Sequence, residues 1–414
     1  MSNNSILVVG GGFAGITAAL EAAEVGYEVY IVETNPYLGG RVTQLNQYFP
    51  KLCPPSCGLE IQFQRIKNNP KVSFYTMAEV TNVAGGPGNY TVSVTQRPRF
   101  VNEKCTICGE CAKAASTEVA SEFDFGVGKR KAAYITHLFA FPQRYVVDPK
   151  SCPADELARI RDACPYGAID IEDKGKTFEL AVGSIVWATG WKPYDVSKLD
   201  NLGGGKLKNV VTNMQMERLA APSGPTSGKI LRPSDGKAPA KIAFVQCAGS
   251  RDQNHLNFCS YICCMASLKQ VTYIRERYPE AKIVVYYIDL RTPGRYDLFK
   301  RKVAADKNLS LVKGKVADIR EDAAGDPIVT VENAVTGIKG EERFDLVVLA
   351  TGMQPSAAGT KLPAAATDED GFVVNAPDKG IVAAGCAKLP LDVMKSAQSG
   401  TGAALRAIQT VVGR

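Results

Sequence analysis

The chain has 414 residues, of which 45% are hydrophobic and 22% are charged, and a formal net charge of +7. A single hydrophobic core usually stops growing before this length, so we expect two or three globular domains. The 49 basic and 42 acidic residues are spread along the whole chain. This distribution gives no reason to expect nucleic-acid binding and indicates at most a mildly basic docking surface.

Twelve cysteines are many for an intracellular enzyme, whereas only two histidines are present. We expect no signal peptide, because the first apolar segment runs directly into a glycine loop. The cysteines are therefore interpreted as ligands or redox groups in a reducing cytoplasm. No apolar run reaches the roughly 20 residues that cross a bilayer. We expect a cytoplasmic protein that associates with a membrane only through partner subunits.

The first motif covers residues 5–33 and has the pattern of a strand, a glycine loop, a helix and a second strand. Gly10, Gly12 and Gly15 fit G-x-G-x-x-G, in which the glycines allow a tight turn, close approach of a pyrophosphate and close helix packing. Glu33 ends the second strand, where it would accept hydrogen bonds from ribose hydroxyls. Gly40 and Arg41 follow in a loop that resembles the pyrophosphate-side loop of flavoproteins with two dinucleotide-binding domains. FAD is therefore the expected cofactor, and a purely structural Rossmann unit is the alternative.

A short loop, FPKLCPPSCGLEI, then places Cys53 and Cys57 on either side of two prolines and a serine. The prolines predict a stiff turn that allows both thiols to face one point. The pair is open to three interpretations: additional cluster ligands, a dithiol, or plain loop cysteines.

Residues 98–175 interrupt this pattern. Cys105, Cys108 and Cys111 have the C-x2-C-x2-C spacing of a bacterial ferredoxin, but the Cys-Pro expected next is missing. Cys164 precedes Pro165 in what looks like the end of a second ferredoxin motif that has lost its other three cysteines. In two-cluster ferredoxins the cysteine before proline binds the other cluster, so these four cysteines predict one 4Fe-4S cluster. A zinc site on the same thiolates is the alternative, and Cys152 has no assigned role.

Two buried strands end in Ala-Thr-Gly, at Gly190 and Gly352, and indicate where the chain crosses between two domains. We expect Gly190, Gly352 and, near the C-terminus, Gly385 to be among the residues that bind the cofactor. Residues 201–240 are rich in glycine, proline and lysine and predict a linker. A second strand-helix-strand unit follows from Lys241, but its loop lacks the glycines that cradle a phosphate. We therefore expect no NAD(P)H site there.

This loop and the following helix instead carry a dense group of cysteines, Cys247, Cys259, Cys263 and Cys264. Soft thiolates at this density favour an iron-sulfur cluster or zinc. Buried free cysteines are the alternative. Lys269 lies five residues beyond Cys264. Near the C-terminus, Gly385 lies where related flavoproteins cradle the ribityl chain, and residues 396–412 predict an amphipathic helix.

Together these stretches resemble the A subunit of heterodisulfide reductase over nearly the whole chain, most specifically in FCSYICCMASLKQ and YYIDLRTPGRY. The resemblance implies an α/β, thioredoxin-reductase-like flavoprotein with two dinucleotide-binding domains and an inserted ferredoxin-like iron-sulfur module. It implies FAD, two 4Fe-4S clusters, and Lys269 near the flavin N5 as the catalytic residue. The expected segments are an FAD domain (1–97, 176–200 and 353–414), the module (98–175), the linker (201–240) and the second dinucleotide-type domain (241–352).

Within that family, the short chain and the KLCPPSCGLE loop are most similar to the A subunit of the quinone-interacting membrane-bound oxidoreductase. This similarity implies a protein that passes electrons between menaquinone and adenylylsulfate reductase. Its expected partners are that reductase, a second flavoprotein of the same family and a membrane haem subunit. The alternatives are a family member that serves another soluble partner, with or without electron bifurcation, and a stand-alone disulfide reductase. A redox-sensing flavoprotein or an assembly scaffold is a further, non-enzymatic alternative.

Overall fold

The computed structural model describes residues 3–413, which form two compact units. Unit 1 contains the described residues up to Trp191 and from Pro355 onward, and unit 2 runs from Lys192 to Gln354. The chain therefore enters unit 2 once and leaves it once. The crossings fall in two short strands, β12 (Trp191–Pro193) and β20 (Met353–Pro355).

Unit 1 is built on a parallel sheet with the strand order β21-β11-β1-β2-β3. Its strands are β1 (Ser5–Val9), β2 (Glu28–Glu33), β3 (Val72–Thr76), β11 (Ser184–Trp187) and β21 (Ile381–Ala383). These strands are almost continuous apolar runs, as expected of a parallel sheet that is covered on both faces. The order confirms the predicted strand-helix-strand start of the chain and the predicted strand before Gly190.

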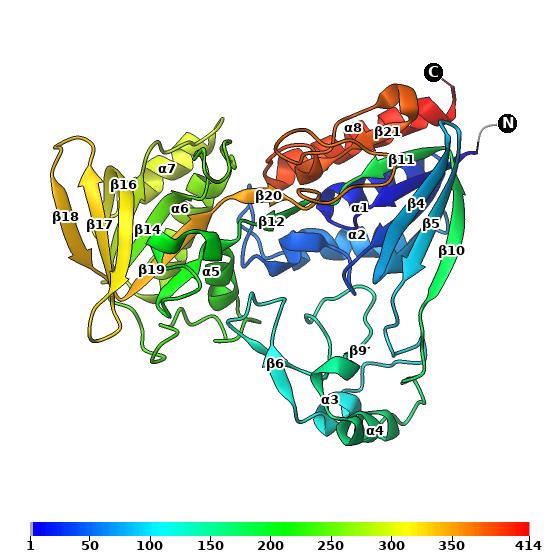
Figure 1. Cartoon of the computed structure of the whole chain (residues 1–414), viewed down its shortest axis with the longest axis horizontal. Coiled ribbons are helices and arrows are strands. Elements are labelled where there is room, and N and C mark those ends of the chain that lie inside the picture. The colour runs from blue at the N-terminus through cyan, green and yellow to red at the C-terminus, as the bar shows by residue number, and fades with distance from the viewer. Residues whose placement is uncertain (1–2, 414) are drawn as a thin grey trace. The chain divides into compact units, whose positions relative to one another are not determined.

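The helices of unit 1 are α1 (Phe13–Glu24), α2 (Ser56–Asn68) and α8 (Val393–Val411), and a 3-10 turn, η1, covers Gly40–Gln44. Figure 1 shows α1 and α8 side by side. Their backbones approach closely, because a Cβ on Gly400 would lie 2.4 Å from the Ala14 carbonyl oxygen. The small residues of the predicted C-terminal helix thus allow it to pack tightly on the helix that begins at the glycine loop.

The other face of the parallel sheet packs against an antiparallel sheet of three strands. These are β4 (Ala78–Gly86), β5 (Asn89–Gln96) and β10 (Lys176–Val182). Valines and leucines alternate along β5 and β10 toward the shared core, including Val92, Val94 and Leu180. This alternation is typical of an antiparallel sheet with one buried face.

The inserted module occupies the connection from β5 to β10. It contains two short helices, α3 (Glu110–Ala114) and α4 (Ala154–Asp162), the short strands β6 (Glu118–Ala120), β7 (Lys129–Lys131), β8 (Ala133–Tyr134) and β9 (Val146–Val147), and a 3-10 turn, η2 (Pro149–Ser151). A single antiparallel bridge between Val101 and Ile169 joins its two ends. It has a small core of its own, to which Ala115, Val147 and Ile160 contribute.

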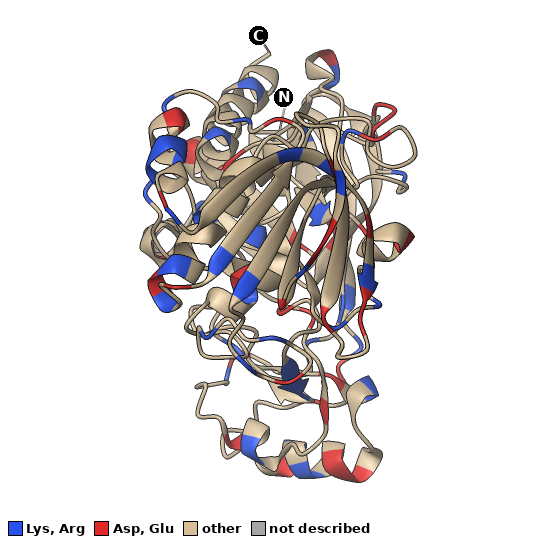
Figure 2. Cartoon of the chain, turned by 90° about the vertical axis from the view of Figure 1, so that its left-hand side faces the viewer, with Lys and Arg blue, Asp and Glu red and all other residues tan. Residues whose placement is uncertain are grey.

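Unit 2 has one sheet of seven strands in the order β13-β19-β14-β15-β16-β17-β18. The strands are β13 (Val210–Thr212), β14 (Lys241–Ala248), β15 (Lys282–Tyr287), β16 (Leu309–Glu321), β17 (Pro327–Asn333), β18 (Lys339–Arg343) and β19 (Leu346–Thr351). The helices are α5 (Asn213–Ala220), α6 (Cys263–Arg277) and α7 (Tyr296–Ala304). Figure 2 shows both basic and acidic residues along the strands of this sheet.

The structure corrects two predicted boundaries. Residues 201–240 were expected to be a linker, but they contain α5 and β13, which pairs with β19 inside the sheet. The FAD domain was expected to include residues 192–200, but Tyr194 and Leu199 belong to the core of unit 2. The sequence misled because this stretch has glycine-rich turns around short, well-buried elements. Among the described residues, no helix combines the length and apolar character needed to cross a membrane.

Candidate functional site

The glycine loop between β1 and α1 leaves no room for side chains at two of its three motif glycines. A Cβ on Gly10 would lie 2.3 Å from the Ala188 carbonyl oxygen, and a Cβ on Gly15 would lie 1.9 Å from the Gly10 carbonyl oxygen. Gly10 also has a φ of +110°, which favours glycine. The loop ends at the N-terminus of α1, where the backbone N–H groups favour negative charge. This geometry fits the pyrophosphate of a dinucleotide.

Glu33 at the end of β2 is tied to this loop. Its Oε2 accepts a hydrogen bond from the Gly11 N–H at 2.7 Å, and its Oε1 accepts one from the Asn35 N–H at 2.8 Å. The side chain is 5% exposed, and burial raises the pKa of its carboxyl group, against the lowering effect of these hydrogen bonds. The carboxylate therefore sits beside the glycine loop, where a Rossmann domain holds the ribose.

The second glycine loop lies against the first. The Gly39 N–H donates to the Gly11 carbonyl oxygen at 2.7 Å, and a Cβ on Gly40 would lie 2.8 Å from the Gly12 Cα. The Arg41 Nε donates to the Trp191 carbonyl oxygen at 3.1 Å. Burial lowers the pKa of the Arg41 guanidinium. The structure thus brings both glycine loops and Arg41 together.

Three further glycines were predicted to bind the cofactor, and two of them lie with the glycine loops of unit 1. Gly190 follows β11, which pairs with β1, and it has a φ of +69° with open space where a Cβ would stand. A Cβ on Gly385 would lie 2.5 Å from the Ala14 Cβ on α1. Gly352 belongs instead to unit 2, where a Cβ would lie 2.2 Å from the Ser250 Oγ. Gly352 therefore lies within the cysteine-bearing part of unit 2 and not in the glycine loops of unit 1.

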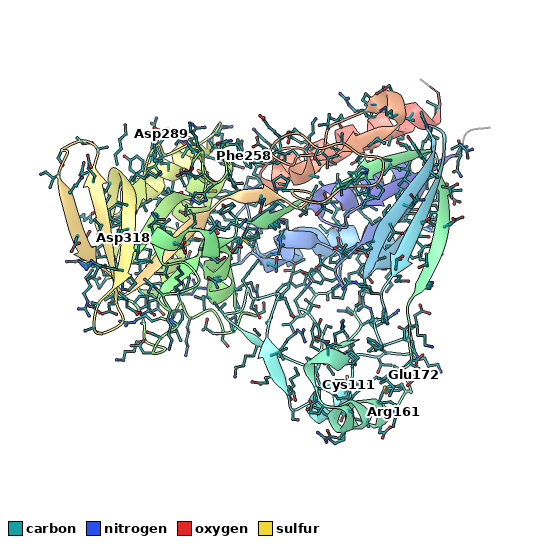
Figure 3. The ribbon with its side chains drawn as sticks, viewed as in Figure 1. Cys111, Arg161, Glu172, Phe258, Asp289 and Asp318 are labelled. Carbon is teal, nitrogen blue, oxygen red and sulfur yellow. The ribbon has the colours of Figure 1, made fainter. Side chains whose placement is uncertain are left out.

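The four cysteines of the module, which we call the module set, line one cavity. Cys105, Cys108, Cys111 and Cys164 surround it together with Val101, Tyr145, Tyr166 and Ile169. Cys111, labelled in Figure 3, is buried, whereas Cys108 is exposed. Burial raises the pKa of Cys111 to about 11, and the other three thiols contribute to this rise. The Ala168 N–H donates to the Cys164 Sγ at 3.3 Å.

Apolar residues occupy two positions where a two-cluster ferredoxin has cysteines. Ala115 lies four positions after Cys111 and Ile160 four positions before Cys164, and both are buried in the module core. Glu156 on α4 accepts four hydrogen bonds, from the N–H and hydroxyl groups of Ser116 and Thr117, at 2.6–2.9 Å. These bonds, those of Thr117 first, lower the pKa of Glu156 to about 2. An anionic anchor and apolar side chains therefore stand where a second set of thiolates would be needed.

The unit 2 set consists of Cys247, Cys259, Cys263 and Cys264. Cys247 lies near the end of β14 with a φ of +58°, Cys259 lies in the following loop, and the adjacent pair begins α6. Burial, followed by the neighbouring thiols of Cys264, Cys247 and Cys259, raises the pKa of Cys263. Burial likewise raises the pKa of Cys264 to about 11. The structure thus gathers four cysteines that are up to seventeen positions apart in sequence.

Hydrogen-bond donors surround this set. The Tyr261 N–H donates to the Cys259 Sγ at 3.4 Å, and the Arg291 N–H donates to the Cys264 Sγ. The Arg251 side chain donates to Cys247 and is held by Asp289 at 2.9 Å. Phe258, which precedes Cys259 in sequence, and Asp289 are labelled in Figure 3 and mark this part of unit 2. N–H donors and a cation near sulfur stabilise thiolates and tune bound clusters.

No three cysteine, histidine or carboxylate side chains among residues 3–413 converge closely enough to hold a single metal ion. A zinc ion needs its thiolates about 2.3 Å from one point. In a 4Fe-4S cluster each thiolate binds a different iron, so the four sulfurs surround a volume. The module set has this arrangement around its cavity.

Lys269 is buried, with 3% exposure, on α6 of unit 2. Its Nζ lies 3.1 Å from the Glu217 Oε1 on α5. Glu217 also accepts hydrogen bonds from the Gln270 Nε2 at 2.7 Å and from the Tyr273 Oη at 3.2 Å. The lysine is therefore an ion-paired interior residue and not a solvated helix lysine.

Sequence reasoning missed three residues at these sites: Glu156, Glu217 and Arg251. Glu217 lies in the stretch expected to be a linker, but Thr212 and Gln215 have the spacing of a capping box, which the structure forms at the start of α5. That signal predicts a helix. Glu156 and Arg251 carry no pattern that distinguishes them from surface charges.

Comparison with known proteins defines the class first. A model of FAD-dependent oxidoreductases matches residues 5–60, which contain both glycine loops and Glu33. The thioredoxin reductase of Lactococcus lactis has a TM-score of 0.55 at 13% identity, covering 99% of this chain and 100% of that one. The thioredoxin reductase of T. acidophilum gives 0.54 at 13% identity, with 99% and 98% covered. The chain thus has the predicted thioredoxin-reductase-like fold, and the match to the FAD-dependent oxidoreductase model supports FAD and an oxidoreductase activity.

Curated relatives make the similarity more specific. The chain is 36% identical to the A subunit of ferredoxin:CoB-CoM heterodisulfide reductase from Methanosarcina mazei, over 99% of this chain and 53% of the relative. It is 38% identical to the iron-sulfur A subunit of CoB--CoM heterodisulfide reductase from Methanocaldococcus jannaschii, over 97% of this chain and 63% of the relative. Its homologues are therefore heterodisulfide reductase A subunits, and their names imply iron-sulfur clusters. The chain spans between about half and under two thirds of their length.

Proposed function

We propose that the chain is an FAD and iron-sulfur electron-transfer subunit that passes electrons between menaquinone and adenylylsulfate reductase. In this proposal it binds one FAD at the glycine loops of unit 1 and two 4Fe-4S clusters, one on each cysteine set. Its partners are the reductase, a second flavoprotein of the same family and a membrane haem subunit. These partners also provide its only association with a membrane.

The observation that carries the proposal is that two separate sets of four cysteines are each gathered at one place. Burial raises the pKa of Cys111 and of Cys264 to about 11, and neighbouring thiols contribute in both sets. Four thiolates at either place would repel one another unless a cation bound them. Iron-sulfur irons supply that positive charge, and the soft thiolate ligands suit them.

The residues of the chain bind the cofactors and adjust their reduction potentials, because the redox chemistry itself belongs to the cofactors. FAD, when bound, accepts electrons in pairs and releases them singly, whereas a 4Fe-4S cluster carries one electron. The glycine loops and Glu33 hold the dinucleotide, and the N–H donors around Cys259 and Cys264 stabilise the sulfur ligands. In this proposal Lys269 is the catalytic residue, and Glu217 fixes the position of its ammonium group.

The first test measures iron, acid-labile sulfide and FAD per chain on anaerobically purified protein, with low-temperature EPR after dithionite reduction. We expect about eight irons, for two four-iron clusters, and one FAD. About four irons would contradict the assignment of one cysteine set. Zinc or no metal with intact FAD would favour a stand-alone disulfide reductase.

The second test addresses the partners. The loaded protein, assembled with its complex, should be reduced by a menaquinol analogue and reoxidised by adenylylsulfate reductase. A soluble donor that reduces the chain while the menaquinol analogue does not would contradict the quinone assignment. It would favour a heterodisulfide-reductase-type subunit for another soluble partner, and bifurcation would then be observed as coupled reduction of two acceptors.

A further inference from the structure

A pair of thiols at the start of α2 belongs to neither cysteine set. Cys53 and Cys57 are both free, and the Cys57 thiol lies near enough to raise the pKa of Cys53. Cys57 is exposed, and Cys53 is half-buried. The two cysteines are four positions apart in one turn of the chain, so a disulfide between them would close only a short loop.

The backbone around the pair is closed into a compact turn. The Tyr48 N–H donates to the Cys53 carbonyl oxygen at 3.0 Å, and the Leu52 N–H donates to the Tyr48 carbonyl oxygen at 2.9 Å. The Cys57 N–H donates to the Pro54 carbonyl oxygen at 3.1 Å. These bonds hold both cysteines at a fixed separation, with Cys57 in the first turn of a thirteen-residue helix.

The two thiols have unequal surroundings. Burial, followed by the contact with Cys57, raises the pKa of Cys53. Cys57 is exposed in the first turn of α2, whereas Cys53 is half-buried. An external reagent therefore reaches the Cys57 thiol more readily than the Cys53 thiol.

We propose that Cys53 and Cys57 form a reversible disulfide by exchange with low-molecular-weight disulfides. The Cys57 thiolate attacks one sulfur of the small disulfide, forms a mixed disulfide and releases one small thiol. Cys53 then loses its proton and attacks the Cys57 Sγ, which forms the intramolecular bond and releases the second small thiol. The protein gives up two electrons and two protons, and the small disulfide gains both.

The site of this modification is close to the dinucleotide-binding loop. The Tyr48 ring lies 6.4 Å from the ring of Phe13, which is the first residue of α1. The Tyr48 hydroxyl lies at Gly58, the residue after Cys57, because a Cβ on Gly58 would be 2.5 Å from the Tyr48 Oη. Burial, followed by Cys57 and Cys53, raises the pKa of Tyr48. The thiol pair is thus separated from the start of α1 by one aromatic side chain.

The test uses the anaerobically purified holoprotein and oxidised glutathione as the probe. Trypsin releases both cysteines in one peptide, Leu52–Arg65, which contains no other cysteine. After treatment, alkylation of free thiols and digestion, we expect this peptide to be two hydrogen atoms lighter and to carry no alkyl group. Dithiothreitol should restore double alkylation.

Variants separate the two roles. Cys53→Ser should accumulate the glutathione adduct at Cys57, because no second thiol resolves it, whereas Cys57→Ser should form no intramolecular bond. Cys152→Ser, a half-buried cysteine of the module, should behave like wild type. A wild-type peptide that keeps two alkyl groups, or that stops at the mixed disulfide, would overturn the proposal. None of these results depends on iron, FAD or a partner, so they are independent of the proposed function.

Discussion

The module set and the unit 2 set differ in exposure and in nearby charge. In the module, Cys108 is exposed, Tyr166 of the cavity wall is 51% exposed, and the backbone N–H of Ala168 donates to sulfur. In unit 2, none of the four cysteines is exposed, and the Arg251 guanidinium donates to Cys247. Positive charge and hydrogen bonds to sulfur favour the reduced state of a cluster, and solvent exposure also changes its potential. Clusters bound at the two sets would therefore differ in reduction potential.

Each cysteine-bearing region contains a buried glutamate, but the two glutamates have different hydrogen-bond partners. Glu156 accepts only neutral donors, from Ser116 and Thr117, shortly after Cys111 in the chain. Glu217 accepts the Lys269 ammonium, six residues beyond Cys263. The difference shows that the module uses its carboxylate to order a loop, whereas unit 2 uses its carboxylate to keep a buried cation in place.

The largest effect is expected from removing one ligand of each set in turn. Cys263→Ala should lower the iron content from about eight to about four per chain and leave FAD bound, and Cys111→Ala should do the same through the other cluster. EPR of the two reduced variants should show different remaining signals. Cys386→Ala, at a buried cysteine outside both sets, serves as the control and should keep all its iron. Iron equal to wild type in Cys263→Ala would contradict the unit 2 assignment.

The next effect concerns the buried ion pair. Glu217→Gln keeps the shape of the side chain but leaves Lys269 buried without its anionic partner. Removing one partner of a buried pair costs about 3 kcal/mol of unfolding free energy. Chemical denaturation should show this loss, whereas Glu276→Gln, at an exposed position on the same helix as Lys269, should change stability by less than about 0.5 kcal/mol. Combining Glu217→Gln with Lys269→Met should recover part of the loss, and a loss unchanged by the second substitution would argue against the pair.

Sequence patterns predicted the parts of the fold that depend on local periodicity. The strand and glycine loop before α1, the strand before Gly190 and the small-residue helix α8 all follow from apolar runs and glycine spacing, and the structure confirms them. The boundary at Lys192 and the strand β13 could not be predicted in this way. The residues of β13 are buried by pairing with β19, a strand more than 130 positions away in sequence.

In the candidate site, too, local sequence patterns predicted some features, whereas features that depend on distant partners were missed. Cysteine spacing predicted both sets, because ligand identity and sequence separation are visible in the chain. The anchors Glu156 and Glu217 could not be found, since a glutamate in a helix is usually exposed and its burial here depends on partners 40 and 52 positions away. Gly352 was predicted to lie with the cofactor glycines, but it lies beside Ser250 in unit 2.

The smallest effect tests Glu156, the module carboxylate whose hydrogen-bond donors are all neutral. Glu156→Gln retains the size of the side chain but replaces a charged acceptor of four hydrogen bonds, so the module should lose about 2 kcal/mol of stability. Iron bound to the module set should then be released faster, while the unit 2 cluster is unaffected. Asp155→Asn, on the same helix and exposed, is the matched control.

The pH dependence of this loss has a definite sign. Hydrogen bonding lowers the pKa of Glu156 from 4.5 to about 2 in the folded chain. Its stabilising contribution is therefore complete above pH 4.5 and disappears as the pH falls toward 2. The difference in unfolding free energy between wild type and Glu156→Gln should accordingly be largest at neutral pH and shrink through this interval. A difference that stays constant from neutral pH down to about pH 2 would show that the ionised carboxylate does not hold the loop. Glu156 would then stabilise the module only through the packing of its side chain, and the contrast with the ion-paired Glu217 would not hold.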